Sequence, residues 1–220
     1  MATPSVPSYR NRMAYHAGLL GGICCLVSVL LILGNMETSA RIADHLEQEK
    51  RATLAEVLPS SLYDNEPLSE VQTAPLHAPF TAPLTIYTAS LKGQFAGAAL
   101  QSSIYGWGGD IQFIAAIDGS GTLTGVRVLS HRETPGLADK IEVQKDDWIE
   151  GFTGKSLANT PGQDWAVRKD GGEFDQFTGA TITPRAVVRG VHASLQELDA
   201  WRQQQLKQAA RAQTTEEGKK

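Results

Sequence analysis

The sequence predicts an α+β fold, in which a largely antiparallel sheet with flanking helices is preceded by one transmembrane helix. Three observations lead to this fold class. An uncharged apolar stretch lies near the N-terminus, paired β segments occupy the middle, and an amphipathic helical pattern lies near the C-terminus. Hairpins followed by segregated helices are typical of α+β domains. The length of 220 residues, without an evident internal repeat, fits one domain with appendages.

Residues 15–36 are predicted to span a membrane. The stretch 17–33 is almost entirely apolar and carries no charge, and its length is sufficient to cross the hydrocarbon core of a bilayer. Arg10 and Arg12 precede it, so the positive-inside rule places residues 1–14 in the cytoplasm and the chain after Met36 outside.

A cleavable signal peptide is the alternative for this stretch. Thr38-Ser39-Ala40 would then be the cleavage site. The apolar core is long for a signal peptide, and a charged helical pattern follows it directly. These two features favour a retained anchor.

Residues 37–83 are predicted to form a juxtamembrane helix and a Pro-rich segment. Apolar residues recur near helical spacing over 37–58, and Pro59 ends the pattern. Four further prolines within 60–83 indicate irregular structure.

Residues 84–201 are predicted to form the main domain, which begins with two β-hairpins. Each hairpin consists of two short β segments around a glycine-containing turn. The first pairs 84–89 with 94–100 around Lys92-Gly93, and the second pairs 111–117 with 123–129 around Asp118-Gly119-Ser120-Gly121.

The second half of this domain is predicted to be mainly helical. Residues 146–152 read as a short helix with an acidic N-cap, and 165–168 as another strand. Residues 184–201 carry an amphipathic helical stripe, with Thr183 as N-cap and Pro184 at the first helical position.

Composition restricts the possible functions. With 20 basic and 24 acidic residues the net charge is −4, which argues against a nucleic-acid partner. The only cysteines, Cys24 and Cys25, are adjacent in the apolar stretch, and the five histidines are scattered. We therefore expect no metal site and no disulfide framework.

The tail, residues 202–220, is rich in charge and glutamine and is expected to be flexible.

The segment Thr178-Gly179-Ala180-Thr181 has the features of an anion site. Gly179 permits a tight turn, and Ala180 adds little bulk. The unpaired N–H groups of the following helix favour an anion, so a phosphate could be bound there or esterified to Thr181. The alternative is a plain capping turn, in which the Thr181 and Thr183 hydroxyls satisfy helix N–H groups.

The segment from Asp175 to Thr181 resembles the flavinylation motif Asp-x-x-Ser/Thr-Gly-Ala-Thr of the FMN-binding domain family. This family includes the G subunit of the Rnf ion-translocating electron-transport complex and the C subunit of the Na⁺-translocating NADH:quinone oxidoreductase. In both, the last Thr carries FMN through a phosphoester bond, installed from FAD by a flavin transferase. The resemblance implies covalent FMN on Thr181. Segments 131–141 and 165–172 are similar to signature segments of the Rnf G subunit.

Given this resemblance, further residues are expected around the flavin. Glu133–Leu137 reads as a type II turn whose backbone N–H groups would meet the ring edge while Leu137 packs on its face. The alternative is a plain turn without ligand. Lys169 would neutralise the phosphate, or would simply be solvated. The expected cofactor-binding residues are Thr178, Gly179, Ala180, Thr183, Glu133, Thr134, Pro135, Gly136, Leu137, Tyr105, Trp107 and Lys169.

The resemblance implies a redox subunit of a membrane-bound ion-translocating oxidoreductase, which carries electrons between partner subunits. In the Rnf family the overall reaction runs between ferredoxin and NAD⁺ on other subunits. The implied location is a bacterial inner membrane, with a cytoplasmic N-terminus and a periplasmic domain. A component like the C subunit of the quinone reductase, or a membrane-anchored binding module without redox function, are the alternatives. His131 is left without an assigned role.

Overall fold

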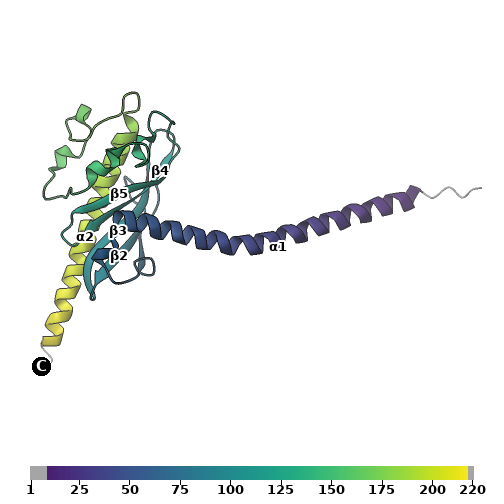
Figure 1. The fold of residues 1–220 in the computed structure, drawn as a ribbon, viewed down its shortest axis with the longest axis horizontal. Helices are drawn as coiled ribbons and strands as arrows, with labels where there is room; N and C mark the ends of the chain where they lie inside the picture. Colours follow the sequence, from purple (N-terminus) through teal and green to yellow (C-terminus); the bar gives the residue numbers. More distant parts are fainter. Residues whose placement is uncertain (1–8, 218–220) are drawn as a thin grey trace, which may run out of the picture. The chain divides into compact units, whose positions relative to one another are not determined.

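The computed structural model describes residues 9–217, with side chains described for 15–35 and 48–211 (Figure 1). The chain divides into two compact units, with the boundary between Lys50 and Arg51. The predicted 1–14 segment lies mostly outside the described residues, as do the last three residues of the predicted tail.

The described residues of the N-terminal unit form the first part of helix α1 (Tyr9–Val57), which continues into the second unit. Residues Tyr15–Asn35 are apolar and long enough to cross a membrane, and none of their side chains is buried. This confirms the predicted N-terminal apolar helix. The segments predicted at 15–36 and 37–58 form one continuous helix, which ends just before Pro59 because proline cannot supply the next helical N–H.

The second unit contains one five-stranded antiparallel sheet in which consecutive strands are neighbours. Its strands are β1 (Val71–Ala74), β2 (Leu84–Leu91), β3 (Gln94–Tyr105), β4 (Asp110–Asp118) and β5 (Leu123–Ser130). Both predicted hairpins are confirmed. Lys92 and Gly93 both have positive φ, at 53° and 74°, as a type I′ turn requires.

Strand β1 was not expected from the sequence. It lies within the segment 60–83, which we predicted to be irregular, and forms an edge of the sheet against β2. Its four residues are mostly exposed, so they lack the alternation of buried and exposed side chains that identifies a longer strand.

Short 3₁₀-helices connect the main elements. They are η1 (Ser60–Leu62), η2 (Asp139–Ile141), η3 (Asp147–Phe152), η4 (Gly162–Asp164) and η5 (Arg168–Asp170). The helix predicted at 146–152 is confirmed as η3, whose N-cap Asp146 accepts the N–H of Trp148 at 3.0 Å. The strand predicted at 165–168 is wrong. Only Val167 forms an isolated bridge, to Phe174, because η4 and η5 bend the chain on either side.

Helix α2 (Ile182–Glu217) is longer than predicted at both ends. It begins two residues before Pro184. Proline is accommodated in the first turn of a helix because the backbone N–H groups of that turn have no helical partner, so the missing N–H of proline breaks no hydrogen bond. Beyond residue 201 the chain stays helical to Glu217, so the described part of the predicted flexible tail is a helix. Arg202 supports this extension by pairing with Asp199 one turn earlier, at 2.7 Å.

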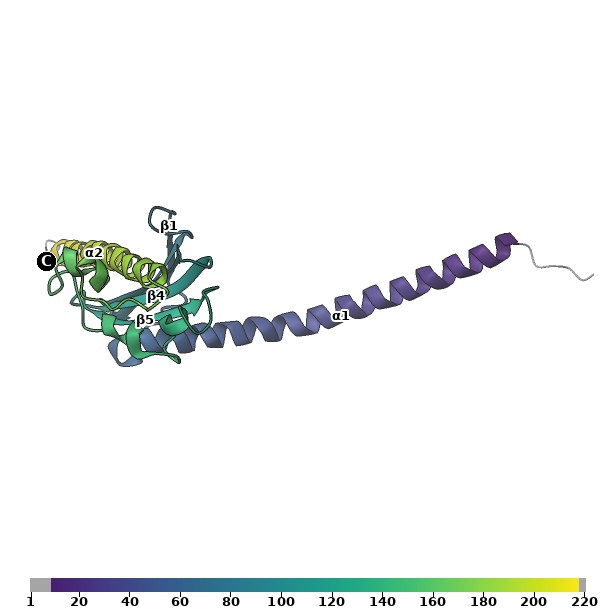
Figure 2. The same ribbon diagram turned by 90° about the horizontal axis from the view of Figure 1, so that it is seen from above.

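The sheet is covered on both faces (Figures 1 and 2). One face packs large side chains, including Phe113 and Ile104, against α2 and the 3₁₀ segments. The other face packs a mixture of small and large side chains, including Ala99 and Ile114, against the end of α1. Helix α2 runs across β3 and β4 on the first face, which brings its first turn to the end of β3 and the segment after β5.

Candidate cofactor site at the start of helix α2

The turn Thr134–Leu137 follows β5 and has the predicted type II geometry. Leu137 N–H donates to the Thr134 carbonyl at 3.2 Å, Pro135 stands at the second position, and Gly136 has φ 77°. An aspartate side chain supports the turn, because Gly136 N–H donates to Asp139 Oδ1 at 2.9 Å.

This bonding changes the role expected for the backbone of the turn. The N–H of Gly136 is bound to Asp139, and those of Leu137 and Ala138 are both bound to the Thr134 carbonyl. Pro135 has no N–H. The expectation that this turn offers several N–H groups to a flavin edge is therefore wrong, and its contribution to the site is the Leu137 side chain and Thr134.

The turn Phe177–Ala180 precedes α2 and has the same form. Ala180 N–H donates to the Phe177 carbonyl at 3.1 Å, and Gly179 has φ 83°. The two turns lie against each other, since a Cβ on Gly179 would stand 3.8 Å from Leu137 Cδ2. Two segments well separated in the sequence thus meet at one point.

A cleft of about 450 Å³ lies between these turns and the β3–β4 loop. It is lined by Trp107, Thr134, Leu137, Ala138 and the segment from Gly179 to Thr183. Ala138 and Ile182 are lining residues that the sequence did not single out. Trp107, Leu137 and Ile182 are 66%, 46% and 45% exposed, so this rim is apolar and open to solvent.

Thr181 and Thr183 occupy different environments. Thr181 is half-buried, and its hydroxyl makes no hydrogen bond to any residue whose side chain is described. Thr183 is fully buried and donates its hydroxyl to Glu133 Oε2. The prediction of Thr183 as N-cap is wrong. Thr181 directly precedes the helix, and its carbonyl accepts the N–H of Arg185 at 3.4 Å.

The first turn of α2 provides the electrostatics of the cleft. The N–H groups of Ile182 and Thr183 have no carbonyl one turn earlier to bond, and the helix dipole adds partial positive charge at this end. A phosphate on the Thr181 oxygen would lie beside these groups.

Several predicted contacts lie outside the cleft. Tyr105 lines a neighbouring hollow of about 400 Å³ with Trp165 and Arg185. Thr178 faces a groove of about 680 Å³ on the other side of Leu137. Lys169 lines neither the cleft nor these hollows, and its backbone N–H donates to Gln176 Oε1 at 3.2 Å. Glu133 is buried behind the cleft.

Asp139 supports the Thr134–Leu137 turn as an ionised carboxylate. The hydrogen bond from Gly136 N–H, together with the Lys145 ammonium at 3.1 Å from Oδ2, lowers the pKa of Asp139 below its ordinary value. No pattern in the sequence indicates this role, because the contact with Lys145 depends on the loop that leads away from η2.

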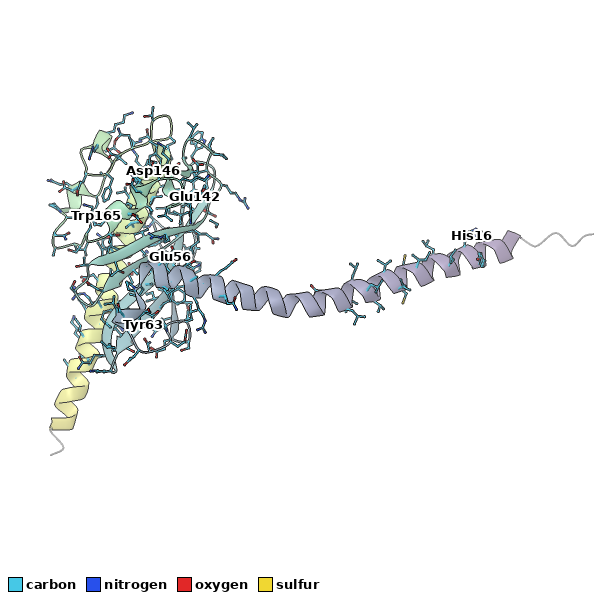
Figure 3. All side chains as sticks on the ribbon, viewed as in Figure 1. His16, Glu56, Tyr63, Glu142, Asp146 and Trp165 are labelled. Atoms are coloured by element: carbon cyan, nitrogen blue, oxygen red, sulfur yellow. The ribbon has the colours of Figure 1, made fainter. Side chains whose placement is uncertain are left out.

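His131 supports the same region from the segment after β5. Its Nδ1 accepts the N–H of Glu133 at 3.1 Å, so the proton is on Nε2, which donates to Glu142 Oε1 at 2.9 Å. Glu142 is labelled in Figure 3. His131 is thus bonded through both ring nitrogens and is absent from the lining of the cleft.

Comparisons with known proteins identify the family. A model of the FMN-binding domain matches residues 106–196, which include both turns. The G subunit of the ion-translocating oxidoreductase complex of Stutzerimonas stutzeri is 51% identical over 194 residues, covering 87% of this chain and 83% of the relative. The chain belongs to the family of G subunits of ion-translocating oxidoreductase complexes.

Other G subunits agree over a similar length. That of Pseudomonas aeruginosa strain UCBPP-PA14 is 48% identical over 200 residues, or 89% of this chain and 94% of the relative. That of Cereibacter sphaeroides is 46% identical over 187 residues, or 84% of each chain. Between the two relatives that the Asp175–Thr181 segment resembles, these matches support the Rnf G subunit over the C subunit of the quinone reductase.

The described residues fit FMN. Trp107, Leu137 and Ile182 form apolar walls for a flat ring, and the cleft is open enough to admit it. Gly179 and Ala180 leave the floor free of bulky side chains. The start of α2 supplies donors and a favourable dipole for the phosphate.

Proposed function

We propose that this chain is the covalent-FMN electron carrier of a membrane-bound ion-translocating oxidoreductase complex. The observation that carries the proposal is the Thr181 hydroxyl. It lies in the cleft, at the start of a long helix, without a hydrogen-bond partner among the described side chains. A hydroxyl in this position is available both for esterification and for the favourable field of the helix.

Attachment would be a phosphoryl transfer that uses FAD. The Thr181 oxygen would attack the phosphorus of the FMN half, the pyrophosphate P–O bond would break, and AMP would leave. The hydroxyl proton would pass to a base of the flavin transferase or to water. The product is a phosphodiester between Thr181 and the ribityl chain of the flavin.

The remaining residues orient the bound group and limit its contact with water. Trp107 and Leu137 would pack against the ring, with Ile182 and Thr134 completing the walls. FMN supplies reversible acceptance and release of electrons, and the protein fixes its position relative to donor and acceptor. The openness of the rim suits a carrier whose flavin must come close to partner subunits.

The proposed partners and location follow from the family. The relatives are named as subunits of an ion-translocating oxidoreductase complex. We therefore place this chain as a redox subunit among other membrane subunits, in a complex of Rnf type that couples ferredoxin/NAD⁺ electron transfer to ion transport. Arg10 and Arg12 ahead of the span support a cytoplasmic N-terminus and a periplasmic domain in a bacterial inner membrane.

Denaturing gel electrophoresis under ultraviolet light tests the covalent flavin. The full chain, coexpressed with a flavin transferase, should give a fluorescent band that survives denaturation. Thr181→Val should abolish the fluorescence because it removes the acceptor hydroxyl. Thr178→Val should only weaken it, because Thr178 belongs to the same turn but lines the neighbouring groove and not the cleft. A wild-type band without flavin would favour the anchored binding module, and flavin retained by Thr181→Val would show that another residue is the acceptor.

A further inference from the structure

Glu133 is a buried carboxylate that joins two segments distant in sequence. It is 4% exposed. Oε1 accepts the N–H of Gly108 at 3.0 Å, and Oε2 accepts the hydroxyl of Thr183. No ion pair to Glu133 is found among the residues with described side chains. Burial of a carboxylate is costly unless hydrogen bonds satisfy its oxygens, so these two bonds account for its placement.

The β3–β4 loop is shaped to fit over this carboxylate. A Cβ on Gly106 would lie 2.3 Å from Glu133 Oε1, and a Cβ on Gly108 would lie 2.0 Å from the Arg132 carbonyl. Both positions therefore require glycine for the loop to approach the Arg132–Glu133 segment this closely. Trp107 lies between these glycines and lines the cleft, so the same approach determines where the indole stands.

Glu133 is fixed from its own backbone as well. Its N–H donates to His131 Nδ1 at 3.1 Å, and His131 Nε2 bonds Glu142 at 2.9 Å. The backbone that carries the carboxylate is therefore held in place independently of Gly108 and Thr183. The loop and the helix start are both located against Glu133.

We propose that Glu133 is a positioning residue for flavin attachment. By holding Gly108 and Thr183 together, it fixes the first turn of α2 against the Trp107 loop. It thereby sets how the Thr181 hydroxyl, two residues before Thr183, is presented beside Trp107. This inference rests on the proposed function, and it replaces the expectation that Glu133 contacts the flavin.

The kinetics of flavin transfer to the purified full chain test the proposal. Thr183→Val removes the donor to Glu133 with little change in shape, and Thr183→Ser keeps the hydroxyl. Thr124→Val is the matched control, since the Thr124 hydroxyl donates to the Val57 carbonyl on the other face of the sheet. Rates are measured with FAD and the transferase at varied acceptor concentration, alongside thermal melts.

Thr183→Val should lower kcat for flavin transfer by roughly 10- to 100-fold, with KM for the acceptor nearly unchanged, because a small misplacement of a reacting group has effects of this size. Thr183→Ser should restore most of the rate. Glu133→Gln should also restore it relative to Glu133→Ala, since an amide carbonyl can accept from Gly108 while its NH₂ donates to the Thr183 oxygen. A wild-type rate in Thr183→Val, or an equal loss in Thr124→Val, would overturn the proposal.

Hydrogen exchange in the flavin-free protein separates this proposal from the proposed function. Peptides that cover residues 106–109 should exchange faster in Thr183→Val and Glu133→Ala than in wild type or Thr124→Val. This readout needs no flavin, so it tests the role of Glu133 even if Thr181 proves not to be the acceptor. Unchanged exchange in both variants would show that Glu133 does not hold the loop.

Discussion

The two type II turns that line the cleft have the same backbone form but different support. At Thr134–Leu137 the glycine N–H is bound to Asp139, which is itself paired with Lys145. At Phe177–Ala180 no side-chain hydrogen bond to the turn is found among the described residues, although the two central residues of both turns are exposed. The first turn is held by a side chain, whereas the second turn, next to Thr181, is not.

This difference matters for a covalent cofactor. An acceptor segment has to enter the active site of a modifying enzyme, and a turn without side-chain hydrogen bonds can adjust to that site more easily. The Phe177 ring is buried and packs edge-on against the Trp148 ring, with 5.1 Å between the ring centroids. Phe177 anchors one end of the second turn, and α2 anchors the other. The tip between them can be reached without unfolding the domain.

Gly179→Ala, in the unsupported turn, should have the largest effect on the rate of flavin attachment. A side chain at φ 83° costs roughly 1–2 kcal/mol. The added Cβ would stand 3.8 Å from Leu137 Cδ2, so backbone strain, and not a steric clash, would force the turn to relax. Because Thr181 is two residues away, relaxation would displace it and lower the rate of flavin attachment by about tenfold or more. In-gel fluorescence over a time course, with chemical denaturation for stability, measures both effects.

Gly136→Ala should separate stability from attachment. Its φ of 77° implies a similar cost of roughly 1–2 kcal/mol, and open space surrounds the added methyl group. The supported turn does not carry the acceptor, so the rate of attachment should stay within about twofold of wild type. Equal losses of attachment rate in the two glycine variants would contradict the distinction between the supported turn Thr134–Leu137 and the acceptor turn Phe177–Ala180.

The support from Asp139 should give the smallest effect, visible in the pH dependence of stability. Its pKa is lowered from 3.8 by the Gly136 N–H and Lys145, so the folded state favours the carboxylate. The stabilisation is present above pH 3.8 and is lost as the pH falls through the lowered pKa. Thermal melts should show Asp139→Asn less stable than wild type at pH 7, with the difference shrinking in acid.

Lys145→Ala provides the control for this effect. It should destabilise wild type but add little in the Asp139→Asn background, because both changes remove the same charge pair. A difference between Asp139→Asn and wild type that stays constant down to about pH 3 would contradict the role given to the carboxylate.

Local signals made much of the fold predictable. The hairpins follow from alternating apolar residues and from glycines that adopt positive φ, and the Pro135-Gly136 pair correctly indicated a type II turn. The start of α2 was misplaced because Thr183-Pro184 is a strong capping signal. In the folded chain, Glu133 takes the Thr183 hydroxyl instead.

The sequence by itself determined the apolar N-terminal helix, the antiparallel hairpins and the motif ending at Thr181, because each depends on residues close together in the chain. The sequence also pointed to Thr181 as the free hydroxyl, but only the tertiary structure decided that Glu133 is the partner of the Thr183 hydroxyl. It also placed Trp107 and Leu137 beside Thr181 and turned Glu133 away from the cleft. These outcomes depend on how α2 packs across the sheet, and contacts between distant segments leave no periodicity in the sequence.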